Sequence, residues 1–527
     1  MGQMNYHDNA FAPYEPICSS EAHPVSVFNQ VRTDSMRSYF RAEIIISLTL
    51  IALSLLTFGH VCLNEFLDYD DSLYVTNNEQ VQAGLTVESA FWAVTSFEHQ
   101  IWHPLTWLSL QLDWELYGPQ AWGFHLSSLL LHTANSVLVF VVLHKMTGAM
   151  WRSALAAAFF AVHPFHVEPV AWVSSRKDVL GLFFALLTML AYAWYAAKPG
   201  LARYGLVPVA FAAALGAKSV FVILPCILVL LDYWPLRRMP WSPEDQGTVS
   251  FPRAQWLLVI AEKLPLLTLS WFASQFAMFA QMSTFANVAI PVEYRIGNAL
   301  VALVTYAGKT FWPVYFPIHY AHPGTDLPLW KPLCAGVLLM ALTIVAITNA
   351  RTRPWLLVGW LWFVGSLVPV CGIIPGGQTT ASMADRYVYL PMLGLLIAGA
   401  WIVPETLWMH STSRRLTIGV IAIGLLFCAG LSWQQVLKWQ NGVSLFQHAV
   451  SMDPENAFAH SGLGAAFYAD GREEEAIPSY EHAVRLMPSN ARFRRILAGG
   501  LRRMGRDEEA RRHEKAIRLP NQPSEPP

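Results

Sequence analysis

The stretch IIISLTLIALSLLTFGHVCL, residues 44–63, contains no Asp, Glu, Lys or Arg. A helix of about 20 apolar residues is long enough to span the hydrocarbon core of a bilayer. Basic side chains favour the cytoplasmic side of a membrane, and Arg32, Arg37 and Arg41 precede the run. The first 40 residues also lack the apolar core of a cleavable signal. The stretch therefore predicts an uncleaved membrane anchor whose N-terminus lies in the cytoplasm.

The composition of the 527 residues indicates that most of the chain, and not only residues 44–63, belongs to a membrane protein. Charged residues make up 13% of the sequence and hydrophobic residues 54%, whereas a soluble protein carries about 25% charged residues. These values exclude a disordered chain and argue against a purely soluble enzyme. Residues 437–527 are different, because they hold 13 Lys/Arg and 12 Asp/Glu. We expect a membrane body followed by a water-soluble tail.

The net charge of −1 produces no field that would attract nucleic acid, so we expect no nucleic-acid partner. The six cysteines are scattered and form no Cys-x-x-Cys pair, which favours buried apolar roles over metal or disulfide chemistry.

Twelve apolar segments follow one another along the chain: 44–63, 123–144, 150–165, 178–197, 203–217, 219–235, 254–279, 294–314, 333–349, 354–372, 387–404 and 415–433. Short basic loops between them should be cytoplasmic, which requires an even number of crossings between Arg253 and Arg351. Segment 294–314 contains Arg295 and Lys309, so we assign it to the membrane surface within an outer excursion, 280–332. The result is 11 crossings, with polar chemistry concentrated on the outer side.

The predicted organisation is all-α. A cytoplasmic tail (1–42) precedes a transmembrane domain (43–436) with outer loops 64–122 and 280–332, and the soluble tail occupies 437–520. Residues 521–527 should be disordered.

The soluble tail carries an internal repeat. Residues 456–489 match the 34-residue tetratricopeptide pattern, a helix–turn–helix unit, at Leu463, Gly464, Phe467, Gly471, Ala476, Tyr480, Ala483 and Pro488. A second copy follows and a partial one precedes it, which gives about two and a half repeats. Because stable arrays usually need three or more repeats, we expect contacts with the membrane domain or a partner to stabilise the tail.

An acidic pair, Asp70 and Asp71, opens the first outer loop directly after the first membrane segment. Carboxylates at a membrane boundary are ordinarily solvated caps. Two functional roles remain open, namely a general base for an acceptor hydroxyl or a ligand for a metal at a phosphate. The sequence implies no firm cofactor, although the pair is compatible with a divalent cation. Asp71 is slightly favoured as the base because it lies nearer the loop.

Histidines and aromatic residues recur on the outer side. His103 lies among tryptophans that suit either a membrane-interface belt or stacking on sugar rings. His163, His166 and Glu168 have metal-ligand spacing, but Pro164 breaks the helix that would align the two histidines. Hydrogen-bonding structural histidines are therefore favoured over a metal site.

Four cations lie on the side where basic residues are disfavoured: Arg176, Lys177, Lys218 and Arg386. Ionisable residues at membrane depth usually have a function, and these could hold a lipid-linked phosphate or diphosphate. The alternative is a structural role in ion pairs with Asp178, Glu168 and Asp385.

Seven ordered stretches of the sequence resemble one known family. They are DDSLYVTNNEQVQAGLT (70–86), WHPLTWLSLQLDWELYG (102–118), GFHLSSLLLHTANSVL (123–138), VHPFHVEPVAWVSSRKDVL (162–180), AKSVFVILPCILVLLDYWPL (217–236), LVGWLWFVGSLVPV (357–370) and MADRYVYLP (383–391). This series is similar to the transmembrane and tetratricopeptide-repeat proteins, O-mannosyltransferase-like members of the GT-C membrane glycosyltransferases.

The resemblance implies a multi-helix membrane core, a polyprenyl-phosphate-sugar donor and repeats that face an acceptor protein. Asp70 and Asp71 match the family's acidic pair, and His163 and Glu168 match its HPxHxE turn. Arg176 and Asp178 fall just after that turn. Lys218 stands where relatives carry Ser-Lys-Glu, although here the acid is missing.

The function that we predict is transfer of a sugar from a polyprenyl-phosphate carrier to a protein Ser/Thr hydroxyl on the extracytoplasmic side. Asp70 or Asp71 would be the base, and the four cations would bind the donor phosphate with His103, His163, His166, Glu168 and Asp178 nearby. The alternative is a non-catalytic membrane scaffold whose repeats dock an envelope or polysaccharide-export assembly.

Overall fold

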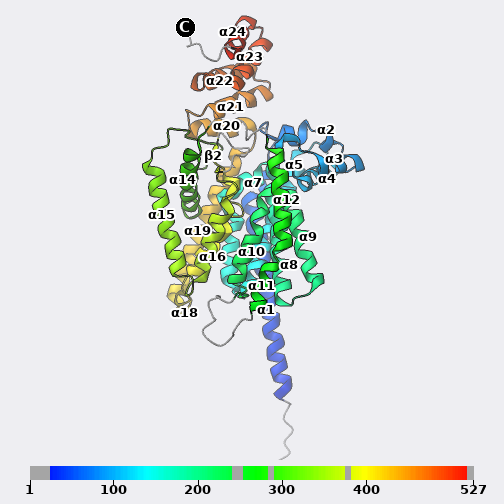
Figure 1. The fold of residues 1–527 in the computed structure, drawn as a ribbon, viewed down its shortest axis with the longest axis vertical. Helices are drawn as coiled ribbons and strands as arrows, with labels where there is room; N and C mark the ends of the chain where they lie inside the picture. The colour runs from blue at the N-terminus through cyan, green and yellow to red at the C-terminus, as the bar shows by residue number, and fades with distance from the viewer. Residues whose placement is uncertain (1–23, 240–252, 283–289, 374–380, 519–527) are drawn as a thin grey trace, which may run out of the picture. The chain divides into compact units, whose positions relative to one another are not determined.

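The computed structural model describes residues 24–239, 253–282, 290–373 and 381–518, and these are mostly helical (Figure 1). The chain divides into two compact units, Met1–Leu48 and Thr49–Pro527. Helix α1 comprises Pro24–Phe58. Residues 1–23 of the predicted cytoplasmic tail and the predicted disordered residues 521–527 lie outside the described residues.

The first outer loop folds into short helices. After η1 (Gly59–Leu63), a π-helical turn η2 (Ser72–Thr76) leads into three α-helices: α2 (Glu79–Gln82), α3 (Val87–Thr95) and, after η3 (Glu98–Gln100), α4 (Pro104–Tyr117). Asn78 caps α2, and Thr86 and Ser89 form a capping box at α3, which explains where these helices begin. Tyr74 and Trp107 belong to the buried core of this loop.

Long apolar helices form the body of the second unit. The first group runs α5 (Ala121–Thr147), α6 (Met150–Val162), η4 (Pro164–His166), α7 (Val167–Ala171), η5 (Val173–Ser175), α8 (Arg176–Ala197), α9 (Leu201–Ala217), η6 (Ser219–Ile223) and α10 (Leu224–Tyr233). Helix α8 packs between α5 and α9. Pro164 ends α6, and the chain bends by 54° before α7.

The second group continues α11 (Arg253–Ala261), α12 (Leu264–Ala280), α14 (Val292–Phe311), β1 (Tyr320–Ala321), α15 (Trp330–Thr348), α16 (Pro354–Leu367), β2 (Ala381–Met383), η7 (Asp385–Val388), α17 (Met392–Ile402), α18 (Thr406–Met409) and α19 (Ser411–Lys438). Gly359 and Gly394 let α16 and α17 pack closely, because a Cβ at either would lie 2.3 Å from the other's carbonyl oxygen. The strands β1 and β2 pair antiparallel.

Six helices of the described residues are long and apolar enough to cross a membrane: Phe40–Leu63, Ala121–Thr147, Val173–Ala197, Leu257–Ala280, Trp330–Thr348 and Ser411–Lys438. The bent pair Met150–Val162 and Pro164–Ala171 would make a seventh span. The protein is thus an integral membrane protein. Helix α14, which the sequence assigns to the membrane surface, is not one of the six. The number of crossings stays a prediction.

The tail consists of helices that follow one another in chain order (Figure 1): α20 (Gly442–Met452), α21 (Ala457–Ala469), α22 (Glu473–Leu486), α23 (Ala491–Arg503) and α24 (Asp507–Arg518). Each helix packs against the next, and α21 and α22 form within the 34 residues of the repeat pattern. Gly464 is needed there because a Cβ would lie 2.7 Å from the ring of Tyr480. The assignment to the tetratricopeptide class stays a prediction.

Candidate functional site

The two carboxylates of the acidic pair have different surroundings. Asp71 is fully buried, and its carboxylate accepts hydrogen bonds from the backbone N–H of Leu67 (2.9 Å), the backbone N–H of Ser174 (2.9 Å) and the Ser174 hydroxyl (2.5 Å). Asp71 therefore fastens the start of the first outer loop to the turn before α8. This is the geometry of a structural anchor.

Asp70 is half-buried, and its backbone carbonyl accepts hydrogen bonds from Leu73 and Tyr74. Its carboxylate has no hydrogen-bond or ion-pair partner among the residues that the structure describes, yet it lies within electrostatic range of Lys177 and Tyr69. Of the acidic pair, Asp70 thus keeps a carboxylate available to a ligand.

Lys177 lies in the first turn of α8 and faces the acidic pair. Its ammonium donates hydrogen bonds to the Tyr74 hydroxyl and the Ser174 carbonyl, each at 2.9 Å, and lies 4.4 Å from the centre of the Tyr74 ring. An ammonium has three N–H donors, so the hydrogen bonds to described residues leave one for a ligand.

Arg386 is held by the bent segment that contains α7. Its guanidinium pairs with the Glu168 carboxylate, and its backbone N–H donates to the same carboxylate at 2.9 Å. The guanidinium carbon lies 5.2 Å from the Trp172 ring and 5.1 Å from the Tyr387 ring, as in cation–π contacts. The Arg386 side chain is 18% exposed, so part of the guanidinium stays accessible.

Lys218 and Asp178 form a second ion pair, with 2.5 Å between the ammonium and Oδ1. Lys218 lies 5.4 Å from the Tyr387 ring, which links this pair to Arg386. The second oxygen of Asp178, Oδ2, is buried and has no hydrogen-bond partner within the described part of the chain. Lys177, Lys218 and Arg386 are therefore gathered around one carboxylate-lined region, together with Asp70.

Arg176 points elsewhere. Its fully buried guanidinium lies 2.6 Å from the Asp113 carboxylate and donates to the hydroxyls of Ser128 and Ser109 and to the Phe124 carbonyl. All of these partners lie on α4 and α5, so Arg176 joins those helices to α8. Geometry favours the structural alternative for this residue.

The three histidines have structural contacts. His163 Nε2 contacts the Thr310 carbonyl at 3.1 Å and its Nδ1 accepts from the Phe165 N–H, whereas His166 Nδ1 contacts the Phe160 carbonyl at 2.7 Å. His103 is fully buried and lies against the rings of Tyr74 and Trp107. Across the described residues, no group of three or more His, Cys, Asp or Glu side chains is arranged to hold a metal.

An aromatic wall, Tyr69, Trp172, Trp439 and Phe446, connects this site with the tail. Tyr69 stacks on Trp172 at 5.1 Å and meets Phe446 of α20 edge-on at 5.8 Å, and Trp172 lies 6.2 Å from Trp439. Sequence reasoning missed this wall, although the adjacency of Tyr69 to the acidic pair was a usable signal.

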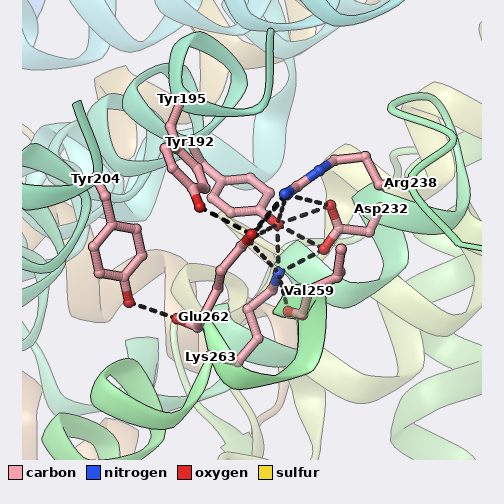
Figure 2. A network of polar contacts seen from close by, with 8 residues as sticks. All are labelled: Tyr192, Tyr195, Tyr204, Asp232, Arg238, Val259, Glu262 and Lys263. Atoms are coloured by element: carbon pink, nitrogen blue, oxygen red, sulfur yellow. Dashed lines mark hydrogen bonds and ion pairs between the residues drawn. The ribbon is translucent and has the colours of Figure 1, made fainter. Parts of the chain in front are cut away.

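A second polar network lies at the far end of α8, 16 residues or about 24 Å along the helix from Arg176. Figure 2 shows its members: Tyr192, Tyr195, Tyr204, Asp232, Arg238, Val259, Glu262 and Lys263. Asp232 lies 2.6 Å from Lys263 and 3.1 Å from Arg238, which also lies 2.7 Å from Glu262. The two carboxylates, Asp232 and Glu262, balance the two cations, Arg238 and Lys263, so the network carries no net charge. It joins α8, α10 and the break between α11 and α12.

Asp71 gives a prediction for the pH dependence of stability. Burial raises the pKa of Asp71 to about 6, against 3.8 for an ordinary aspartate, so the native state keeps a proton that the unfolded chain has lost between these values. The stabilising contribution is complete below about pH 4 and is lost as the pH rises through 6. Measured against Asp71→Asn, the wild-type protein should lose about 2–3 kcal/mol across this range in thermal unfolding at several pH values. A constant difference between the two proteins would contradict the assignment.

Known proteins similar to this chain include protein O-mannosyl-transferases of several animals. The chain is 23% identical over 443 residues to protein O-mannosyl-transferase F38B6.6 of Caenorhabditis elegans, covering 81% of this chain and 61% of the relative. It is 25% identical over 487 residues to protein O-mannosyl-transferase TMTC4 of Mus musculus, covering 80% and 64%. A shorter match, 36% identical over 132 residues, is to protein O-mannosyl-transferase Tmtc2 of Drosophila melanogaster, covering 24% and 14%.

No family model matches the chain. The chain spans less than two thirds of the length of these curated relatives. The long matches nevertheless cover most of the membrane body and carry the same family name as the short one. The chain is therefore related to the TMTC-type protein O-mannosyl-transferases, the family that its motifs predicted.

Proposed function

We propose that this protein is a GT-C-type membrane glycosyltransferase that moves a sugar, of the mannose type, from a polyprenyl-phosphate carrier to a Ser/Thr hydroxyl of a protein. One observation carries the proposal: the Asp70 carboxylate lies within electrostatic range of the Lys177 ammonium, and Lys177 is in turn within electrostatic range of Arg386. The names of the relatives support the reaction class.

In the proposed reaction, the acceptor oxygen forms a bond to the anomeric carbon while the bond from that carbon to the phosphate oxygen breaks. Asp70 takes the hydroxyl proton, because a neutral hydroxyl is a weak nucleophile. The carrier leaves as a phosphate monoester and gains one negative charge. Cations placed at the developing charge stabilise the transition state more than the ground state.

Three cations suit the phosphate. Among the described residues Lys177 donates only two hydrogen bonds, while Lys218 and Arg386 each pair with one carboxylate and keep 15% and 18% of their side chains exposed. Four of the five N–H donors of Arg176 point to groups on α4 and α5 and the side chain is buried, so we propose a positioning role for it in place of the phosphate contact that the sequence suggested.

The orientation and the domains complete the proposal. Eleven crossings would place residues 1–42 in the cytoplasm and the repeats of residues 437–520 outside, on the side of Asp70. The contact between Tyr69 and Phe446 supports a tail that presents an acceptor polypeptide near the base.

Arg386 provides a test of donor binding. Arg386→Ala should weaken binding of polyprenyl-phosphate mannose about 10–100-fold, because a charge-assisted contact is lost. Arg386→Lys should retain part of the affinity, since it keeps the charge without the bidentate geometry. Binding can be measured with the purified protein in nanodiscs.

Arg152→Ala is the matched control, because Arg152 pairs with the exposed Glu405 on a distant loop. Normal donor binding by Arg386→Ala, together with a lower unfolding temperature, would show that the Arg386–Glu168 pair is structural only.

A further inference from the structure

The loop that carries Arg386 is built from two distant parts of the chain. Tyr320 of β1 pairs with Met383 of β2, and Ala321 pairs with Ala381. Asp385 and Arg386 follow β2 after one residue, Ala384, so contacts that hold β1 also help to fix the position of Arg386.

A buried chain of polar groups connects this loop to α14. The Lys309 ammonium donates to the Tyr320 hydroxyl at 2.7 Å, and that hydroxyl donates to the Asp385 carboxylate at 2.7 Å. Lys309 also donates to the Tyr315 carbonyl. Lys309 and Asp385 are both buried, so the Tyr320 hydroxyl lies between two ionisable groups that are shielded from water. Burial raises the pKa of Asp385, while the Lys309 charge opposes that rise.

Helix α14 holds the backbone of the same loop at two further points. The Tyr306 hydroxyl accepts from the Ala384 N–H at 2.8 Å and donates to the Ala384 carbonyl at 3.0 Å. The Asn298 side chain donates to the Ser382 carbonyl at 2.9 Å. Helix α14 thus forms hydrogen bonds with the residues immediately before Arg386, while the Glu168 carboxylate binds Arg386 itself.

We propose that Lys309, Tyr320 and Asp385 are positioning residues that fix Arg386 for the donor phosphate. This inference rests on the proposed function. The proposal gives the predicted outer excursion, residues 280–332, a function: its helix α14 and strand β1 hold Arg386, about 70 positions later in the chain, in place. Tyr320 is the central member, because its hydroxyl both accepts from Lys309 and donates to Asp385.

The test compares Tyr320→Phe with Tyr204→Phe in nanodiscs, using polyprenyl monophosphate as the probe. Tyr320→Phe removes the connecting hydroxyl and should weaken binding about tenfold, which is the effect of a lost hydrogen bond to a charged group. Tyr204→Phe removes a hydroxyl that donates to the Glu262 carbonyl in the polar network at the far end of α8 and should leave binding unchanged. Equal effects of the two variants would overturn the proposal.

A double-mutant cycle separates positioning from general stability. If Tyr320 acts through Arg386, adding Tyr320→Phe to Arg386→Ala should weaken binding no further. Additive effects would overturn the proposal.

Hydrogen–deuterium exchange of the free protein keeps this inference distinct from the proposed function. Tyr320→Phe should increase exchange of the Arg386 backbone amide, which is bonded to Glu168. If the wild-type protein binds no polyprenyl phosphate, the proposed function fails, and the positioning claim then stands or falls on this exchange. Unchanged exchange would overturn it.

Discussion

Asp70→Asn should lower the rate of sugar transfer by about 10²–10⁴-fold at saturating donor, the usual contribution of a positioned general base. Asparagine keeps the shape of the side chain but cannot take the acceptor proton. Because the Asp70 carboxylate has no hydrogen-bond partner among the described residues, the change should leave folding and donor binding intact. Initial transfer rates to a Ser/Thr peptide would measure the effect.

Asp68→Asn is the matched control, since Asp68 is exposed two residues earlier and undergoes the same chemical change. Its transfer rate should equal that of the wild-type protein. A wild-type rate for Asp70→Asn would show that Asp70 is a solvated cap and would make Glu168 the next residue to test.

Asp232→Ala should have the largest effect on stability, a loss of about 3–5 kcal/mol in the free energy of unfolding. Asp232 is fully buried and lies 2.6 Å from the Lys263 ammonium, which is itself 3% exposed, so removing the carboxylate leaves the buried ammonium with only the longer Glu262 contact of 3.6 Å among the described residues. Thermal unfolding of the purified protein in detergent, followed by circular dichroism, would measure the loss.

Removing both charges should restore part of that stability. Asp232→Ala combined with Lys263→Met removes both charges of this pair and leaves Arg238 paired with Glu262, so the double variant should lose less stability than the sum of the two single losses. Tyr204→Phe serves as a control at the edge of the network, where the hydroxyl donates to the Glu262 backbone carbonyl at 2.6 Å, and should cost about 1 kcal/mol. Strict additivity of the two substitutions would contradict the network.

Local patterns in the sequence predicted much of the fold. The run 44–63 lies within an apolar helix, Pro164 ends α6 as its ring requires, and α21 and α22 form inside the 34-residue pattern. Each of these features depends on residues close together in the chain.

The roles within the site depend on residues that are far apart. Asp70 and Asp71 are adjacent, and the sequence slightly favoured Asp71. The geometry favours Asp70 as the base, because the Asp71 carboxylate already accepts two hydrogen bonds from Ser174, which lies more than 100 positions later in the chain. Asp113, on another helix, likewise forms an ion pair with the Arg176 guanidinium. Periodicity and spacing carry no information about such pairings.

Some of the missed groups did leave a signal. Asp232, Glu262 and Lys263 are ionisable residues within apolar segments, which is the general mark of a buried polar network. The sequence offers Asp178, Glu168 and Asp385 as ion-pair partners of the four cations without assigning pairs. The structure pairs Asp178 with Lys218 and Glu168 with Arg386, whereas Asp385 accepts a hydrogen bond from Tyr320. What the sequence could not tell was which cations keep a donor available for a ligand.

The most direct test is transfer by the purified protein in nanodiscs, supplied with polyprenyl-phosphate mannose and a Ser/Thr-rich peptide and analysed by mass spectrometry. We expect the wild-type protein to add hexose to a Ser or Thr and the Asp70→Asn protein to add almost none. Folded wild-type protein that binds no carrier and adds no hexose would contradict the account and favour a membrane scaffold.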